Sequence, residues 1–182
     1  MKRTLIYGGT FDPPHLAHVR LPHEAMVSLE FERVLYIPAL QSPLKEESPT
    51  SAVHRLAMLE LAIEDAPWAE ISTIELDRSG TSYTIDTIES LNNNGEELRL
   101  LIGADQWKQF EQWHRWKELA NLAIPAIMPR SGIDVDDPRL LSIEPLPAAS
   151  TDIRSLIERG ESIESFVCPK VSSYIAQHAL YL

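Results

Sequence analysis

The opening stretch of the chain, TLIYGGTFDPPHLAH, constrains the fold more than any other segment. An apolar run from Thr4 to Tyr7 predicts a buried strand, two glycines predict a turn, and helical spacing follows from Ala17 to about Leu29. This order places the unpaired N–H groups of a helix start beside the end of a strand. We therefore predict that an anion such as phosphate binds at residues 8–18.

Two histidines, His15 and His18, stand three residues apart at the predicted helix start and add donors for phosphate oxygens. Asp12 and the two prolines after it stiffen the turn, because proline restricts its own φ and its predecessor. An isolated Gly-Gly turn is more often a plain helix cap. The whole stretch from Tyr7 to His18 is a more specific pattern than such a turn, and it favours a phosphate-binding loop. The histidines also suggest a metal pair, but no third ligand is evident in the sequence, so zinc is not expected.

Strand and helix patterns alternate along the rest of the chain. Strands are predicted at residues 33–37, 71–76, 98–102, 124–128 and 142–146, and helices at 17–29, 52–65, 83–91, 106–110, 113–122, 150–160 and 169–178. Pro22 is expected in the first turn of its helix, and Ser51 is the expected N-cap of the helix after it. The alternation predicts an α/β fold, a doubly wound, mostly parallel, Rossmann-like sheet with helices on both faces. We expect one domain, residues 1–182, whose C-terminal helical part (about residues 150–182) packs on the sheet.

The charge balance excludes some classes of protein. The 182 residues include 16 Lys and Arg against 27 Asp and Glu, a formal net charge of −11, so nucleic-acid binding through a basic face is not expected. The single Cys168 excludes an internal disulfide and a cysteine-based zinc cluster. No stretch approaches the roughly 20 apolar residues that span a bilayer, and no signal peptide is evident. We expect a cytoplasmic protein without membrane contact; the oligomeric state stays open, a homo-oligomer included.

In parallel sheets, ligands bind beyond the carboxyl ends of the strands. Four segments of interest are predicted at that edge: residues 8–18, 38–45 and 103–105, and the loop before Ser150. In Ser150-Thr151-Asp152-Ile153-Arg154, two hydroxyls at a helix start and an arginine one turn later are suited to a second anion. Alone, this motif is more often plain N-capping with an exposed arginine. Together with the opening loop, it favours one shared site. For Arg55, a surface charge and a site role are equally expected.

Four motifs in order, GGTFDPPHLAH, SYTIDT, GADQWKQFEQW and STDIR, resemble those of the bacterial nicotinate mononucleotide adenylyltransferases. This family lies within the HIGH-type nucleotidyltransferase superfamily, and the likeness runs over nearly the whole chain. The first and last motifs are shared by the superfamily, whereas Ser82-Tyr83-Thr84 and the Asp105–Trp113 segment are typical of the nicotinate branch. Ala17 replaces the usual glycine of the histidine tetrad, and Pro38-Ala39-Leu40 replaces the usual Pro-Asn.

The resemblance implies transfer of the adenylyl group of ATP to nicotinate mononucleotide, giving deamido-NAD and pyrophosphate, with Mg²⁺. It implies catalytic roles for His15, His18 and Arg154, and an ATP site that adds Gly8, Gly9, Thr10, Phe11, Gly103, Asp105, Ser150 and Thr151. It also implies a mononucleotide site. In that site Trp113 stacks on the nicotinate ring, Tyr83 and Thr84 offer backbone amides to its carboxylate, and Lys45 lies near the phosphate.

Three alternatives stay open at this point. The acceptor could instead be nicotinamide mononucleotide, phosphopantetheine or a sugar phosphate; the SYT segment and Trp113 argue against phosphopantetheine but do not separate acid from amide. The chain could also be a nucleotide-binding regulatory module without catalysis, for which Ala17 is the warning sign. Finally, Trp107, Trp113 and Trp116 stand at helix-compatible spacing, and aromatic stripes of this kind usually pack in a core.

Overall fold

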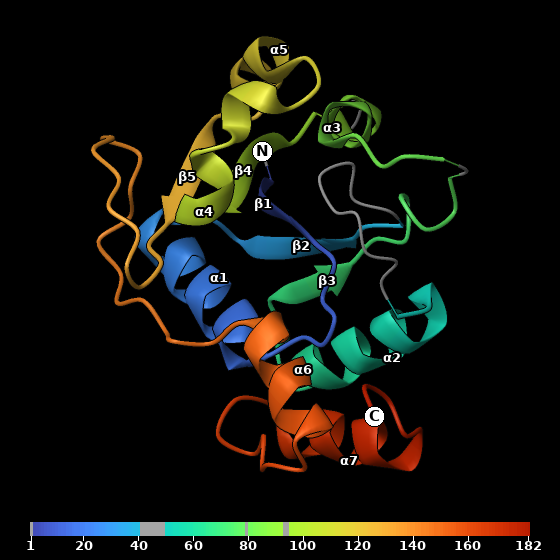
Figure 1. Ribbon diagram of the computed structural model, residues 1–182. Helices are drawn as coiled ribbons and strands as arrows, with labels where there is room; N and C mark the ends of the chain where they lie inside the picture. The colour runs from blue at the N-terminus through green and yellow to red at the C-terminus, as the bar shows by residue number, and fades with distance from the viewer. Residues whose placement is uncertain (1, 41–49, 79, 93–94) are drawn as a thin grey trace.

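The computed structural model describes residues 2–40, 50–78, 80–92 and 95–182. Five strands form one sheet in the order β3-β2-β1-β4-β5, and all four neighbouring pairs are parallel (Figure 1). The strands are β1 (Arg3–Gly9), β2 (Arg33–Pro38), β3 (Ala69–Ile71), β4 (Glu97–Gly103) and β5 (Pro125–Met128). This is the strand order of a doubly wound fold, so the predicted fold class is confirmed.

Helices cover both faces of the sheet, because the side chains of each strand alternate between two apolar cores. Leu5 and Tyr7 belong to the core shared with α1 (Leu16–Ser28), whereas Ile6 belongs to the core shared with α3 (Thr84–Leu91) and α5 (Trp116–Leu122). In Figure 1, α1 and α2 (Ala52–Ile63) lie below the sheet and α3 and α5 above it. The strands are apolar on both faces, as expected for a parallel sheet.

The carboxyl ends of the central strands lie at one edge of the sheet. Gly9 of β1 pairs with Pro38 of β2, and Gly103 of β4 pairs with Met128 of β5. Beyond this edge, β4 runs directly into the short helix α4 (Ala104–Trp107), which is followed by the 3-10 helix η2 (Phe110–Gln112). The strand order changes direction at β1: β2 and β3 lie on one side of it, and β4 and β5 on the other. In doubly wound folds, a crevice for ligands opens at such a point.

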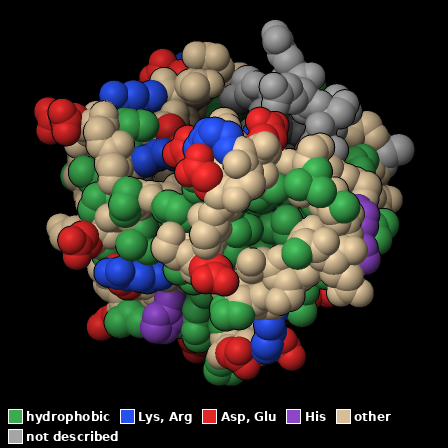
Figure 2. Space-filling model, turned by 60° about the horizontal axis from the view of Figure 1, so that its bottom comes forward, with side chains coloured by type: hydrophobic (Ala, Val, Ile, Leu, Met, Phe, Trp, Pro, Cys, Tyr) green, Lys and Arg blue, Asp and Glu red, His purple; other side chains and the backbone are tan. Residues whose placement is uncertain are grey.

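The last two helices, α6 (Ser150–Glu158) and α7 (Pro169–Gln177), pack on α2. Their shared core contains the fully buried Met58 of α2, Ile153 of α6 and Val171 of α7. The loop between them also contacts α1, because the N–H of Leu16 donates to the carbonyl of Phe166 over 2.8 Å. On the face that this part of the molecule presents, acidic, basic and apolar side chains lie interspersed (Figure 2). None of the described helices is long and apolar enough to cross a membrane.

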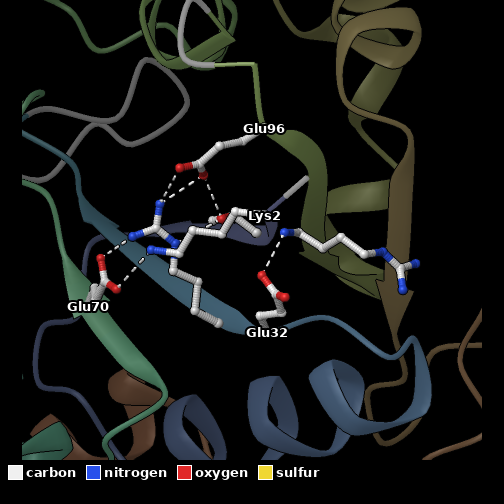
Figure 3. Close-up of polar contacts among 7 residues, drawn as sticks. Lys2, Glu32, Glu70 and Glu96 are labelled. Carbon is white, nitrogen blue, oxygen red and sulfur yellow. Dashed lines mark hydrogen bonds and ion pairs between the residues drawn. The ribbon is translucent and has the colours of Figure 1, made fainter.

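Charged side chains gather at the edge of the sheet where the strands begin, opposite the carboxyl ends (Figure 3). The guanidinium of Arg33 contacts the carboxylates of Glu70 and Glu96, and Thr4 Oγ1 donates to Glu96 over 2.8 Å. Arg33 and Thr4 therefore hold the pKa of the Glu96 carboxyl below its ordinary value. Lys2 adds a looser contact to Glu70, at 3.7 Å. These pairs are partly exposed, so each contributes little to stability, and together they join the amino ends of neighbouring strands.

Of the predicted strands, one has different bounds and one is absent from the structure. The strand expected at residues 71–76 is β3, which ends at Ile71; beyond it, Thr73 and Asp77 close a turn through hydrogen bonds of 2.7 and 2.9 Å. Residues 142–146, expected as a strand, form no strand. Their apolar residues nevertheless pack on the core, Ile143 and Leu146 among them. The alternation in the sequence therefore reflects burial of one side of an extended segment rather than sheet pairing.

Three details of the predicted helices are also corrected. Pro22 lies at the seventh residue of α1 rather than in its first turn. The helix expected from Trp113 begins at Trp116, because Arg115 before it adopts a left-handed conformation with φ 52°. Ser51 is the N-cap of α2 as expected, but its side chain makes no capping hydrogen bond.

We expect the C-terminal helices and the sheet to unfold as one unit. Replacing Met58 by Ala removes a fully buried side chain between α2 and the C-terminal helices and should lower the free energy of unfolding by about 2–5 kcal/mol. Val53→Ala on the same helix is the control, since Val53 is 74% exposed and should change stability by less than about 1 kcal/mol. Urea denaturation followed by fluorescence and circular dichroism measures both. Equal effects of the two substitutions would contradict this packing.

Candidate active site

A cavity of about 870 Å³ opens at the carboxyl ends of the strands. Its walls come from the loop after β1, the start of α3, the end of β4 and the start of α6. Every described residue that the sequence singled out lines it: Gly8, Gly9, Thr10, Phe11, His15, His18, Tyr83, Thr84, Gly103, Asp105, Trp113, Ser150, Thr151 and Arg154. Lys45 lies outside the described residues. Segments more than 140 positions apart thus share one concave surface.

The loop after β1 is shaped by a close approach at Gly9. A Cβ atom at this position would lie 2.9 Å from the ring of Phe11, so only glycine fits. Phe11 itself adopts a left-handed backbone, φ 52°, and its side chain is buried beneath the loop against Tyr7. At Gly103, a Cβ would lie 2.6 Å from Oδ1 of Asp105, a partly exposed side chain that can move aside, so this position is less restricted than Gly9.

His15 and His18 lie stacked at the start of α1, with ring centroids 3.6 Å apart. The backbone N–H of His15 donates to Nδ1 of His18 over 3.2 Å. Because Nδ1 of His18 accepts this bond, its neutral ring carries the proton on Nε2. Burial, and to a smaller extent the charge of Arg130, lower the pKa of His15 to about 4. The His15 ring therefore supplies a neutral polar group rather than a fixed positive charge near pH 7.

Arg130 is a cavity residue that the sequence analysis missed. It follows β5 by two residues and donates to Asp105 through Nη1 over 3.1 Å. Its position just beyond the end of a strand could have identified this arginine. Arg130 and Asp105 are both partly exposed, with 44% and 39% of their side chains accessible, so both groups remain open to a ligand.

Arg55 has a structural role, which corrects the surface-charge alternative. Its side chain is buried, and its guanidinium donates to the carbonyls of Thr10, Leu40 and Thr50 over 2.8–3.3 Å. It therefore joins the loop after β1 to both described ends of the segment between β2 and α2. A charged donor strengthens each of these hydrogen bonds.

The last helices also bind the loop after β1. Arg154 donates to the carbonyl of Asp12 over 2.8 Å, and Ser150 Oγ donates to the carbonyl of Pro13 over 2.9 Å. Ser150 is the first residue of α6, not its cap, which is Ala149. The carboxylate of Asp12 accepts from the hydroxyl of Tyr181 over 2.6 Å, across 169 positions of the chain. Tyr181, which also lines the cavity, was missed because nothing in its local sequence distinguishes it.

At the other end of the cavity, a buried carboxyl supports the start of α3. Thr87 Oγ1 donates to Glu75 over 2.8 Å, and Ser82 accepts from the N–H of Leu40 over 3.2 Å. Burial raises the pKa of Glu75. Tyr83, the N-cap of α3, makes no side-chain capping bond, so the amides of the first turn depend on other partners.

Trp113 takes part in both the core and the cavity. Its ring packs on Phe110, with centroids 5.4 Å apart, and its side chain lines the cavity. Among the described residues, its buried Nε1 has no hydrogen-bond partner. Trp107 and Trp116 pack against the apolar core beside it, as the core alternative predicted. Of the three tryptophans, Trp113 alone therefore combines packing with a place on the cavity wall.

The model of the cytidylyltransferase-like family matches residues 6–172. The chain belongs to this family. A Herpetosiphon aurantiacus protein named "Probable nicotinate-nucleotide adenylyltransferase" is 41% identical over 197 residues, covering 100% of both chains. A Roseiflexus relative of the same name is 37% identical over 191 residues, covering 97% of this chain and 96% of the relative. The resemblance stated from the motifs is confirmed.

The fold of this cytidylyltransferase-like chain also matches solved structures. Plasmodium falciparum nicotinic acid mononucleotide adenylyltransferase, complexed with NaAD, superposes with a TM-score of 0.85 at 20% identity. The match covers 100% of this chain and 98% of that one. At this identity the likeness establishes the shared fold.

The donor set of the cavity bears on how a metal ion would bind this family member. Among the described residues, no three His, Cys, Asp or Glu side chains lie close enough to hold a metal ion. The carboxylate of Asp12 already accepts from Tyr181 and from the N–H of Thr50, at 2.6 and 3.0 Å. These residues fit a divalent ion that is held mainly by nucleotide phosphates and water, as Mg²⁺ usually is.

The buried position of His15 predicts a pH dependence. Its pKa is about 4 in the folded chain and about 6.5 when exposed, so the unfolded chain binds the extra proton between these values. Stability should therefore be fully present above pH 6.5 and fall as the pH drops from 6.5 to 4. NMR titration of the His15 ring should give a midpoint near pH 4 rather than near 6.5. A midpoint near 6.5 would contradict this burial.

Proposed function

We propose that the chain transfers the adenylyl group of ATP to nicotinate mononucleotide, giving deamido-NAD and pyrophosphate in NAD biosynthesis. The observation that carries this proposal is the cavity itself. It combines a glycine loop, two histidines and the STDIR helix start with the SYT segment and Trp113. The full-length relatives, 33–41% identical and named for this activity, support the same reaction.

In the proposed reaction, an oxygen of the mononucleotide phosphate attacks the α-phosphorus of ATP in line. A new P–O bond forms, and the bond between the α-phosphorus and the bridging oxygen breaks, releasing pyrophosphate. The mononucleotide phosphate is already ionised near pH 7, so no side chain has to act as a nucleophile. Catalysis then consists of positioning two anions and stabilising charge on the phosphoryl oxygens.

The side chains around the loop after β1 are suited to the triphosphate. The Nε2 proton of His18 is the donor that we assign to a phosphate oxygen, with His15 stacked behind it. Gly8, Gly9, Thr10 and Phe11 would line the nucleotide. Ser150, Thr151 and Arg154 would hold the departing pyrophosphate, since a helix start favours anions. Asp105, beside Gly103, would accept from the adenosine ribose, with Arg130 as its partner.

The acceptor would lie at the α3 end of the cavity. There the amides of Tyr83 and Thr84 are suited to the nicotinate carboxylate, and Trp113 offers an aromatic face to its ring. Lys45, which follows β2 in the sequence and lies outside the described residues, is proposed for the mononucleotide phosphate. Mg²⁺ is proposed to enter with ATP and to neutralise its phosphates, which an acidic chain with a net charge of −11 requires near its site.

A pyrophosphate-release panel tests the proposed substrates. With ATP and Mg²⁺, nicotinate mononucleotide should support faster release than nicotinamide mononucleotide, because the α3 amides favour a carboxylate over an amide. Phosphopantetheine and sugar phosphates should support none. A strong preference for the amide would refute the acid as substrate. ATP binding without release on any acceptor would indicate a regulatory module instead.

His18→Ala should lower kcat by about two to three orders of magnitude, the usual cost of removing a transition-state donor. Steady-state pyrophosphate release measures the effect. His23→Ala on the same helix is the control, since His23 packs on Trp68, with ring centroids 4.8 Å apart, and does not line the cavity. If the two variants keep equal turnover, His18 has no role in the chemical step.

A further inference from the structure

Pro22 interrupts the hydrogen bonds of α1 at the carbonyl of His18. In an α-helix, the N–H of residue 22 would donate to the carbonyl of residue 18, but proline has no N–H. Pro22 is buried in the middle of the helix, at its seventh residue. The carbonyl of His18 therefore cannot receive its helical hydrogen bond, although the ring of the same residue lines the cavity.

Tyr36 of β2 supplies the missing donor. Its hydroxyl donates to the carbonyl of His18 over 2.9 Å. Tyr36 is fully buried and does not line the cavity, so this phenol cannot reach a ligand there. Burial also raises the pKa of Tyr36 well above its ordinary value, so the hydroxyl remains protonated. The bond connects the helix directly to a strand of the central sheet.

Tyr36 also contacts the residues beneath the loop after β1. Its ring lies 5.6 Å from that of Tyr7, its register partner on β1, and 5.9 Å from that of Phe11. The ring of Phe11 in turn meets that of His18 edge-on at 5.2 Å. His18 is thus held at its backbone by Tyr36 and at its ring by Phe11 and by the N–H of His15.

We propose that Tyr36 is a positioning residue for adenylyl transfer, which fixes the backbone of His18 because Pro22 leaves its carbonyl without a helical donor. The inference rests on the proposed function, in which His18 donates to a phosphate oxygen. A displacement of this donor by a fraction of an ångström weakens an interaction that is made only in the transition state. A tyrosine that merely fills the core would instead be replaced by phenylalanine without effect on turnover.

The test is a double-mutant cycle of Tyr36→Phe and Pro22→Ala, measured as steady-state pyrophosphate release. Tyr36→Phe alone should lower kcat about tenfold, with a smaller change in the KM for ATP, since one hydrogen bond of ordinary strength is lost. Pro22→Ala restores an N–H at position 22 that donates to the same carbonyl. In that background, Tyr36→Phe should therefore lower kcat by no more than about twofold.

Tyr174→Phe is the matched control. It removes a phenol that bonds Nδ1 of His54 over 3.0 Å, between α7 and α2, and it should leave kcat unchanged. An equal loss of kcat from Tyr36→Phe in both backgrounds would overturn the proposal, as would no loss in either. Turnover is measured without denaturant, at a temperature at which urea titrations show that every variant is folded.

A second readout does not require turnover. In the substrate-free protein, Tyr36→Phe should shift the NMR signal of the His18 ring more than that of His54, and Pro22→Ala should reverse the shift. If the wild-type chain releases no pyrophosphate with any acceptor, the proposed function fails and this comparison decides the positioning role alone. An unmoved His18 signal would then overturn it.

Discussion

Three backbone carbonyls of the loop after β1 each accept a hydrogen bond from a side chain of α2 or α6. Arg55 of α2 donates to Thr10, Arg154 of α6 donates to Asp12, and Ser150 donates to Pro13. A loop that must point its N–H groups at an anion leaves its carbonyls on the other side without partners. The packing of the C-terminal helices on α2 satisfies them, so the shape of the cavity depends on that packing.

The electrostatics of the cavity follow from the same arrangement. The guanidinium of Arg55 donates to three backbone carbonyls, and His15 is buried with a pKa of about 4. Neither side chain therefore offers a free cation to a phosphate. In the proposed reaction, the charge of the triphosphate would be neutralised by its own metal ion and by Arg154 and Arg130. The anion binding that we propose would therefore depend on the geometry of the donors rather than on excess positive charge, which agrees with the acidic composition of the chain.

Patterns within single segments predicted the sheet and most of its helices. The alternation of Leu5, Ile6 and Tyr7 between two cores and the apolar run of β4 are properties of a few neighbouring residues. The rule that ligands bind beyond the carboxyl ends of parallel strands also predicted that the motifs lie at one edge of the sheet. The strand predicted at residues 142–146 was wrong, because a segment that buries alternate residues without pairing has the same sequence pattern as a strand. Arg130 was missed because no motif surrounds it, and only its position just beyond β5 places it in the cavity.

The sequence alone determined the family, the order of most elements and the place of the two histidines at the start of α1, since each depends on local pattern or motif; the two glycines expected in a turn are the last residues of β1. Only the tertiary structure decided which groups hold that loop. The phenol of Tyr181 reaches Asp12 across 169 positions, and the phenol of Tyr36 replaces the donor that Pro22 lacks. The physical reason is that a polar group without a local partner accepts from a donor that folding brings within about 3 Å, whether it is the carboxylate of Asp12 or the carbonyl of His18, and no spacing in the sequence encodes that contact.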